Sequence, residues 1–356
     1  MTVEGMGLVQ EQSRSVERDS ARASHLPGAP SLRGVRAANG QAWEVFRRTL
    51  EPRWTGVWVD LALRYALLAG GFAAACLIAA TAGNAVGFLL APITALWMGF
   101  WFASIVLFMH EAAHFNLHPD KRRNDRMAQW LVCILIGDDI RRYRAVHWEH
   151  HLHLGDTDDT EVSYHFAPTL RCALENLIGV HVWRVFKEHH RARAGGGQAA
   201  AGPARGWLGL ASGVALHAMI VMFAVLAGWY SAAAAWVLAV GVCFPFFSAL
   251  RNQLEHRSVD ATSDVDYRVT PHGAVNRMFA SSPFARAFGS TGFRRHLLHH
   301  WDPQISYSRF DEFEAFLMQT DLAPEIDEAR TTYLSIWRVL AAPTVESRSR
   351  AEAPAR

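Results

Sequence analysis

The residues best suited to do chemistry in this chain are histidines, and nine of them fall into four short motifs. Within each motif the spacing is three or four residues, which places imidazoles on one face of a helix, where they can bind one metal ion or bridge two. Nine imidazoles exceed what one ion can use, so the pattern predicts a two-metal site. The motifs are His110-Glu-Ala-Ala-His114, His147-Trp-Glu-His150-His151, Asn252-Gln-Leu-Glu-His256 and His296-Leu-Leu-His299-His300.

The ligand types narrow the choice of metal. Ligation by imidazole alone suits iron, copper or zinc, and Asn252, one helical turn before His256, adds an amide. Three motifs also carry a glutamate, namely Glu111, Glu149 and Glu255. Because ligating histidines usually donate their second N–H to a carboxylate or a carbonyl, we interpret these glutamates as partners of the ligands. The alternative is that they are ordinary surface charges.

The first motif alone allows a different interpretation. HEAAH also fits the zinc metalloprotease pattern, in which the glutamate is the general base. An intramembrane protease of this kind would need one zinc ion held by His110, His114 and one further ligand. The two HxxHH motifs and the NxxxH motif would then have no role, so we favour the two-metal interpretation.

Two apolar stretches must position these motifs. No Asp, Glu, Lys or Arg occurs in the 45 residues from Tyr65 to Met109, or in the 45 residues from Gly206 to Leu250. A membrane-spanning helix needs about 20 apolar residues, so each stretch can hold two spans joined by a turn. We predict turns at residues 81–84 and 228–231, where glycines interrupt the apolar runs. The predicted spans are about residues 61–82, 86–109, 207–228 and 231–250.

Charge predicts the orientation. Both turns are uncharged, whereas arginines and lysines flank the two hairpins. The positive-inside rule then places the flanks, both termini and every histidine motif on the cytoplasmic side. The predicted fold is an all-α integral membrane protein with four transmembrane helices in two hairpins, and a cytoplasmic helical cap, residues 110–205 and 251–320, that holds a di-metal site.

The remaining segments are simpler. Residues 1–40 mix Ser, Arg, Gly and Pro without periodicity, and we expect a disordered N-terminal tail. Residues 41–342 form the predicted membrane domain, with a linker around 195–203, and residues 343–356 form a C-terminal tail. The four cysteines form no CxxC motif, so they support neither a disulfide framework nor an iron–sulfur site.

Over roughly residues 55–310 the chain resembles the membrane fatty acid desaturase and hydroxylase superfamily, which is recognised by three histidine boxes, HxxxH or HxxxxH followed by two HxxHH motifs. The resemblance implies a non-haem di-iron centre held by His110, His114, His147, His150, His151, His256, His296, His299 and His300. It also implies that Asn252 acts through a water molecule. The segment from Tyr143 to Glu161 looks like bacterial members, whereas the shorter HxxxH spacing differs from that of animal acyl-CoA desaturases.

The reaction implied by this resemblance is oxidative. Reduced iron and O2 would remove hydrogen from an unactivated methylene of a fatty acyl chain and leave a double bond. Hydroxylation, ketone formation or oxidative decarboxylation on the same scaffold are alternatives that the motifs do not separate. No fused cytochrome or flavin domain is visible, so we expect an external electron donor, with ferredoxin the expected one. We expect membrane lipid but no nucleic acid as a partner, and a bacterial inner-membrane location.

Overall fold

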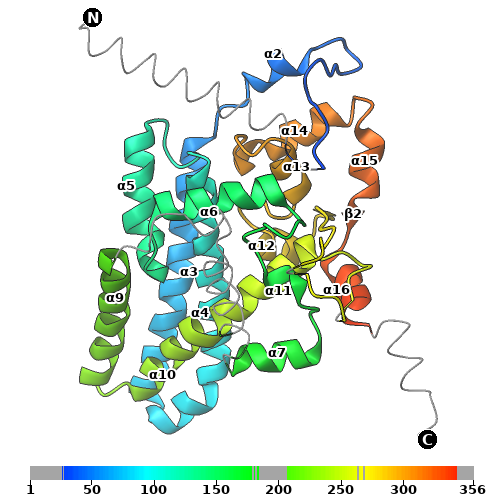
Figure 1. Cartoon of the computed structure of the whole chain (residues 1–356). Coiled ribbons are helices and arrows are strands. Elements are labelled where there is room, and N and C mark those ends of the chain that lie inside the picture. The colour runs from blue at the N-terminus through cyan, green and yellow to red at the C-terminus, as the bar shows by residue number, and fades with distance from the viewer. Residues whose placement is uncertain are drawn as a thin grey trace, which may run out of the picture.

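The computed structural model describes residues 26, 28–178, 180, 183, 207–262, 264–267 and 269–342. The predicted linker at 195–203, the C-terminal tail and most of the N-terminal tail lie outside these residues. Figure 1 shows a bundle of long helices with a group of shorter helices gathered at one end.

Four helical segments are long and apolar enough to cross a membrane. Three are the continuous helices α3 (Trp54–Thr81), α4 (Gly83–Ala113) and α9 (Trp207–Leu226). The fourth segment runs from Tyr230 to His256 and consists of α10 (Tyr230–Leu238), the π-helical turn η4 (Ala239–Cys243) and α11 (Phe244–His256). The predicted all-α membrane architecture is therefore confirmed.

Three of the four candidate spans begin or end outside the predicted boundaries, and α9 lies within them. Helix α3 begins at Trp54 rather than near residue 61, although this adds Asp60 to the helix. The Asp60 carboxylate lies 3.4 Å from Arg64, one turn further on, and Arg64 also donates a hydrogen bond of 2.8 Å to Ser104 of α4. This pairing makes the charges tolerable close to the apolar region. Helices α4 and α11 likewise continue past their apolar parts and carry histidines at their ends.

Both predicted turns are present, and they meet. Gly83 and Gly228 adopt φ angles of 85° and 76°, in the left-handed region that glycine occupies without a steric penalty. Asn84, next to the first turn, donates to the carbonyl of Gly228 at 2.8 Å and accepts from the backbone N–H of Ser231 at 3.0 Å. This asparagine therefore joins the two hairpins at the end of the bundle opposite the histidines.

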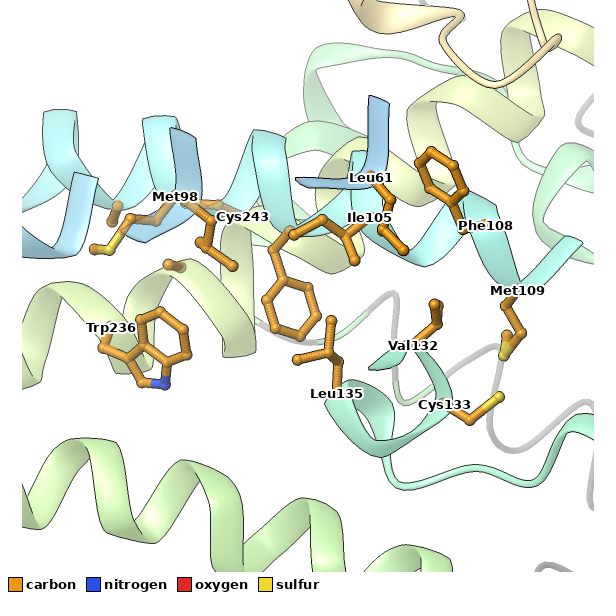
Figure 2. Packing of buried hydrophobic residues seen from close by; sticks show 14 of the residues in the cluster. Leu61, Met98, Ile105, Phe108, Met109, Val132, Cys133, Leu135, Trp236 and Cys243 are labelled. Carbon is orange, nitrogen blue, oxygen red and sulfur yellow. The ribbon is translucent and has the colours of Figure 1, made fainter. Parts of the chain in front are cut away.

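The main core is centred on α4. Ile105, Phe108 and Met109 of α4 share one buried apolar cluster with Val132 and Cys133, which belong to the segment that follows the first histidine motif. Figure 2 shows Met109 beside these two residues. That segment consists of α5 (Lys121–Leu131) and the 3-10 turn η1 (Cys133–Ile136). The apolar packing holds the start of the cap against the span that carries the first histidines.

Short elements make up the rest of the cap, and they lie at one end of the bundle and along one side of it (Figure 1). They are α6 (Ile140–His153), η2 (Ser163–His165), α7 (Leu170–Leu177), α12 (Pro283–Phe288), α13 (His296–Trp301), η5 (Tyr307–Arg309), α14 (Phe310–Leu317), α15 (Ala323–Glu328), α16 (Tyr333–Ala341) and the paired two-residue strands β1 (Met278–Phe279) and β2 (Arg330–Thr331).

The segment just before the first span also packs on the cap. Trp43 of α2 (Trp43–Arg47) stacks on Phe313 with 4.8 Å between ring centroids, and Leu32 and Ala37 are buried in the same cluster. Residues 28–40 were expected to belong to a disordered tail, but here they have defined positions. The partners of Leu32 and Ala37 lie far away in the sequence, so no local periodicity indicated this packing.

Candidate metal centre

The first histidine motif occupies the last turn of α4. His110 lies within the helix and His114 is its C-terminal capping residue, so the two imidazoles project from the same face at the end of the span. Asn124 of α5 donates to the carbonyl of Ala112 at 3.0 Å, and Arg144 of α6 donates to the carbonyls of Ala112 and Ala113. These bonds satisfy the open carbonyls at the helix end and hold the motif in place.

The second motif lies on α6, whose start is capped by Asp139. The Asp139 carboxylate accepts the backbone N–H groups of Arg141 and Arg142 at 2.9 and 3.1 Å. His147 and His151 lie one turn apart, and their Nε2 atoms are 3.0 Å from each other.

The motif His296-Leu-Leu-His299-His300 forms most of the short helix α13, and the motif Asn252-Gln-Leu-Glu-His256 ends α11. Every residue of α13 is buried, including His296, His299 and His300. The end of α11 is held by Arg277, whose guanidinium donates to the carbonyls of Leu254 and Glu255 at 3.1 and 3.2 Å. This contact fixes the backbone that carries His256.

The histidines gather into two groups. The first, called here the five-histidine group, has one nitrogen from each member within 4.8 Å of the others. Three of its Nε2–Nε2 distances are 3.0 Å for His114–His147, 3.0 Å for His147–His151 and 2.9 Å for His151–His299. The members of the five-histidine group are His110, His114, His147, His151 and His299.

The second group, called here the four-histidine group, lies beside the first, since the rings of His151 and His300 are 4.5 Å apart. Its Nε2–Nε2 distances are 3.0 Å for His256–His296 and 3.2 Å for His296–His300. The Glu255 carboxylate is close enough to His256 and His296 to share an ion with them. The members of the four-histidine group are His150, His256, His296 and His300.

These distances fit metal ligation. Two nitrogens bound at right angles to one ion, through bonds of about 2.1 Å, lie about 3.0 Å apart. All nine histidines are at most 6% exposed, and among the described residues the Nε2 atoms of His110 and His150 have no hydrogen-bond partner. Buried nitrogens without a partner are rare in proteins unless something else binds them. The donor set therefore fits two transition-metal ions.

The protonation states of the buried histidines also suit metal binding. Burial lowers the pKa of His114 from its ordinary 6.5 to about 3. Burial and the neighbouring imidazoles lower the pKa of His147, His151 and His299 well below the ordinary value. These histidines are therefore neutral near pH 7, and the neutral imidazole is the form that binds metal.

The sequence did not lead us to predict that Asp159 contacts the candidate ligand His150. Asp159 is buried beyond the end of α6, with its Oδ1 atom 2.8 Å from Nδ1 of His150. Its Oδ2 atom accepts from the Tyr164 hydroxyl at 2.5 Å and from the backbone of Gly155 at 3.1 Å. Burial lowers the pKa of His150, but Asp159 outweighs this and raises the pKa overall. The only signal was the acidic segment that follows the second motif.

The three predicted glutamates differ from one another. Glu111 and Glu255 are each 1% exposed, and Glu111 lies 3.9 Å from Nδ1 of His110, too far for a hydrogen bond. Glu149 is half-exposed and faces His153 at 3.5 Å, a histidine outside both groups. Position 149 is about 200° around the helix from position 147, which explains why its side chain points away from the ligands.

Asn252, the predicted amide, lies on α11 one helical turn before His256. Asn252 of α11 is buried and donates from Nδ2 to the Glu161 carboxylate, while its Oδ1 atom has no partner among the residues described. Neighbouring Arg251 lies with its guanidinium 4.4 Å from the centre of the Phe293 ring. Asn252 is thus positioned with an unused acceptor atom.

Comparison with known proteins gives a family match and no match to an individual curated protein. The family model described as fatty acid desaturase matches residues 87–333, which is more than half of the chain and includes all four histidine motifs. With this match, four candidate spans and two buried histidine groups, the chain belongs to the fatty acid desaturase family.

Proposed function

We propose that this protein is an O2-dependent membrane desaturase with a di-iron centre, which introduces a double bond into a fatty acyl chain. Family membership implies oxidative chemistry of the desaturase or hydroxylase type on a fatty acyl substrate in a lipid environment. The observation that carries the finer proposal is the division of nine buried histidines into a group of five and a group of four. Each group has enough ligands for one iron ion.

The chain's own residues would hold the metals and keep water out. The five-histidine group would hold one iron and the four-histidine group the other, with Asn252 contributing through a water molecule. When bound, the two irons would supply the power to activate O2 and remove hydrogen from a methylene. Asp159 orients His150, and Arg277 holds the end of α11 on which His256 lies.

A cavity of about 340 Å³ supports an aliphatic substrate. Its lining is mostly apolar and includes Leu250 and Leu254 of α11, Phe288 of α12 and Trp337 of α16. A narrower crevice between α4, α11 and α12 shares Phe288 with this cavity and reaches Arg251. We propose that the cavity and crevice receive the acyl chain beside the metal centre.

The proposal includes the electron donor and the orientation of the protein in the membrane. Arg122, Arg123 and Arg141 are exposed on the cap, and Lys121 and Arg142 lie nearby. A basic surface of this kind suits an acidic electron donor such as ferredoxin. We propose that this side faces the cytoplasm of a bacterium, because the same charges obey the positive-inside rule.

The first experiment is metal analysis of the detergent-purified protein, combined with iron spectroscopy. Close to two irons per chain is the expected result. One zinc ion without iron after reconstitution would overturn the proposal in favour of the hydrolase alternative based on Glu111. Mass spectrometry of lipids from cells that express the protein then separates an alkene product from an alcohol, a ketone or a shortened chain.

A further inference from the structure

A second cavity, of about 320 Å³, lies on the histidine side of the bundle and is lined by arginines. It is bounded by the start of α3, the end of α12, the loop 289–295 and the segment 307–311. Four guanidinium groups face two carboxylates around it, so its walls carry an excess of positive charge. The charged residues are Arg64, Arg286, Arg294, Arg295, Asp60 and Asp311.

Two of the four arginines are already neutralised. Arg64 pairs with Asp60 at 3.4 Å, and Arg295 forms an ion pair with Asp311. In the part of the chain that the structure describes, Arg286 and Arg294 form no ion pair with a carboxylate. The positive excess of the cavity therefore resides on these two side chains, and guanidinium groups bind carboxylate and phosphate through paired hydrogen bonds.

The loop that forms the cavity wall is strained. Thr291 adopts φ of 56°, which is unfavourable for a β-branched residue, and Gly292 follows with φ of 87°. A side chain at Gly292 would collide with Tyr307 and Phe310, at 2.7 and 2.8 Å from the Cβ position. Strain of this kind is retained where the surrounding structure imposes it, often at binding sites.

Thr291 also brings an unused polar group to the cavity. Its side chain is 3% exposed, and among the described residues its hydroxyl has no hydrogen-bond partner. The neighbouring Ser290 is fixed to the bundle, since its hydroxyl lies 2.8 Å from that of Ser104, which accepts from Arg64 at 2.8 Å. A buried hydroxyl without a partner, on a loop anchored in this way, is expected where a ligand completes the site.

The cavity lies close to the metal centre. Two residues beyond Thr291, the Phe293 ring stacks on His296 with 4.8 Å between centroids and lies 4.6 Å from His110. Helix α12 connects the regions, because Arg286 lines this cavity, Ala287 lines the crevice and Phe288 lines the apolar cavity. Successive residues of a helix point about 100° apart, so the polar cavity, the crevice and the apolar cavity adjoin different faces of α12, where one amphipathic molecule can contact both polar and apolar walls.

We propose that this arginine cavity binds the anionic end, a carboxylate or a phosphate, of an amphipathic substrate, with Arg286, Arg294 and the Thr291 hydroxyl as its contacts. The inference rests on the proposed function for the fate of the acyl chain. Binding of the anion itself requires neither iron nor oxygen.

The test is equilibrium binding of radiolabelled laurate to the protein in an uncharged detergent, with dodecyl phosphate, dodecanol and inorganic phosphate as competitors. Laurate and dodecyl phosphate should bind more tightly than dodecanol. Arg286→Gln and Arg294→Gln should each weaken laurate binding by about tenfold, the usual effect of losing one charge-assisted hydrogen bond. Arg338→Gln, which removes an exposed arginine of α16, is the matched control and should bind as the wild type does.

The competitors identify the source of the anion. If inorganic phosphate displaces laurate, the cavity binds phosphate groups whether or not they carry an alkyl chain. Displacement by dodecyl phosphate but not by inorganic phosphate supports an anionic amphiphile. Equal displacement by dodecanol and dodecyl phosphate, or equal losses in Arg286→Gln and Arg338→Gln, would overturn the inference.

Thr291→Gly separates strain from ligand contact. Glycine accepts the positive φ, so the variant should melt at a higher temperature and bind laurate more weakly. A higher melting temperature with unchanged affinity for laurate would show that Thr291 does not contact the ligand. Iron content measured on the same samples distinguishes failure of this inference from failure of the proposed function. A normal iron content without a preference for anions would reject anion binding in the cavity and leave the di-iron proposal standing.

Discussion

The five-histidine group and the four-histidine group use the two HxxHH motifs in opposite ways. From the second motif, His147 and His151 join the five-histidine group and His150 joins the other. From the motif that begins at His296, His296 and His300 join the four-histidine group and His299 joins the five-histidine group. Each motif therefore supplies a pair spaced by four residues to one group and a single histidine to its neighbour. This exchange ties the two groups into one structure.

The groups also differ in the contacts of their Nδ1 atoms, the ring nitrogens that do not take part in the short Nε2–Nε2 distances. In the four-histidine group, Nδ1 of His150 contacts Asp159 at 2.8 Å and Nδ1 of His256 contacts the carbonyl of Val275 at 3.2 Å. In the five-histidine group, Nδ1 of His114, His151 and His299 have no partner among the described residues. Nδ1 of His296, in the four-histidine group, also has no partner among the described residues. The outer contacts therefore distinguish His150 and His256 in particular.

The exchanged histidines should be the most sensitive positions. His150→Ala and His299→Ala each remove the ligand that one motif lends to the other group, so turnover should fall more than about a hundredfold, beyond the usual effect of losing an outer contact. Bound iron should fall below two per chain. Mass spectrometry of the product and elemental analysis measure the two effects.

His153→Ala is the control, since His153 is half-exposed and lies outside both groups. It should retain activity and iron. Full activity in either His150→Ala or His299→Ala would refute the assignment of the ligands.

Asp159→Asn should affect the two groups unequally. Loss of the carboxylate that orients His150 should weaken iron binding to the four-histidine group by about 10- to 100-fold and leave the five-histidine group loaded. Iron titration followed by spectroscopy should show a wider gap between the two affinities in the variant than in the wild type. Asp158→Asn, at the exposed neighbouring position, should change neither. Equal weakening of both irons would contradict the separation drawn between the groups.

Acid should destabilise the metal-free protein, although His150 contributes with the opposite sign to the other buried histidines of the site. The lowered pKa of His114 means that its stability contribution is complete above pH 6.5 and is lost as the pH falls toward about 3. The raised pKa of His150 acts in reverse, since its contribution is present below pH 6.5 and is lost as the pH rises through the folded-state pKa.

Melting temperatures of the metal-free protein between pH 7.5 and 5 measure this balance. The lowered pKa values are more numerous, so the melting temperature should fall with acid. The fall should be steeper in Asp159→Asn, in which His150 loses the partner that favours its charged form. A shallower fall in that variant would show that Asp159 does not hold the His150 proton.

The smallest effects are expected at the predicted amide and glutamates. Asn252→Ala should lower turnover by about tenfold or less, because it removes an outer contact and no direct ligand. Glu111→Gln should retain substantial iron, and Glu149→Gln should behave as the wild type because its carboxylate faces His153. Iron content and product formation test all three. Loss of all activity with full metal retention in Glu111→Gln would favour the hydrolase alternative.

Much of the architecture follows from local patterns. The uncharged stretches predicted four spans in two hairpins, and the glycines at 83 and 228 marked both turns. The start of the first span was less predictable, because Asp60 pairs with Arg64 inside α3 and the helix begins at Trp54, before the predicted boundary near residue 61. Residues 28–40 were misjudged for a related reason, since Leu32 and Ala37 become buried against distant aromatic side chains.

The sequence by itself determined which residues are candidate ligands, because histidines spaced by three and four residues share one helical face and can bind a metal ion together. Only the tertiary structure decided how they are divided, since the fates of His150 and His299 depend on how α6 and α13 approach each other. The same holds for Arg286 and Arg294, which line one cavity with Asp60 and Tyr307. Their roles arise from contacts across the folded chain, and such contacts leave no local pattern in a sequence.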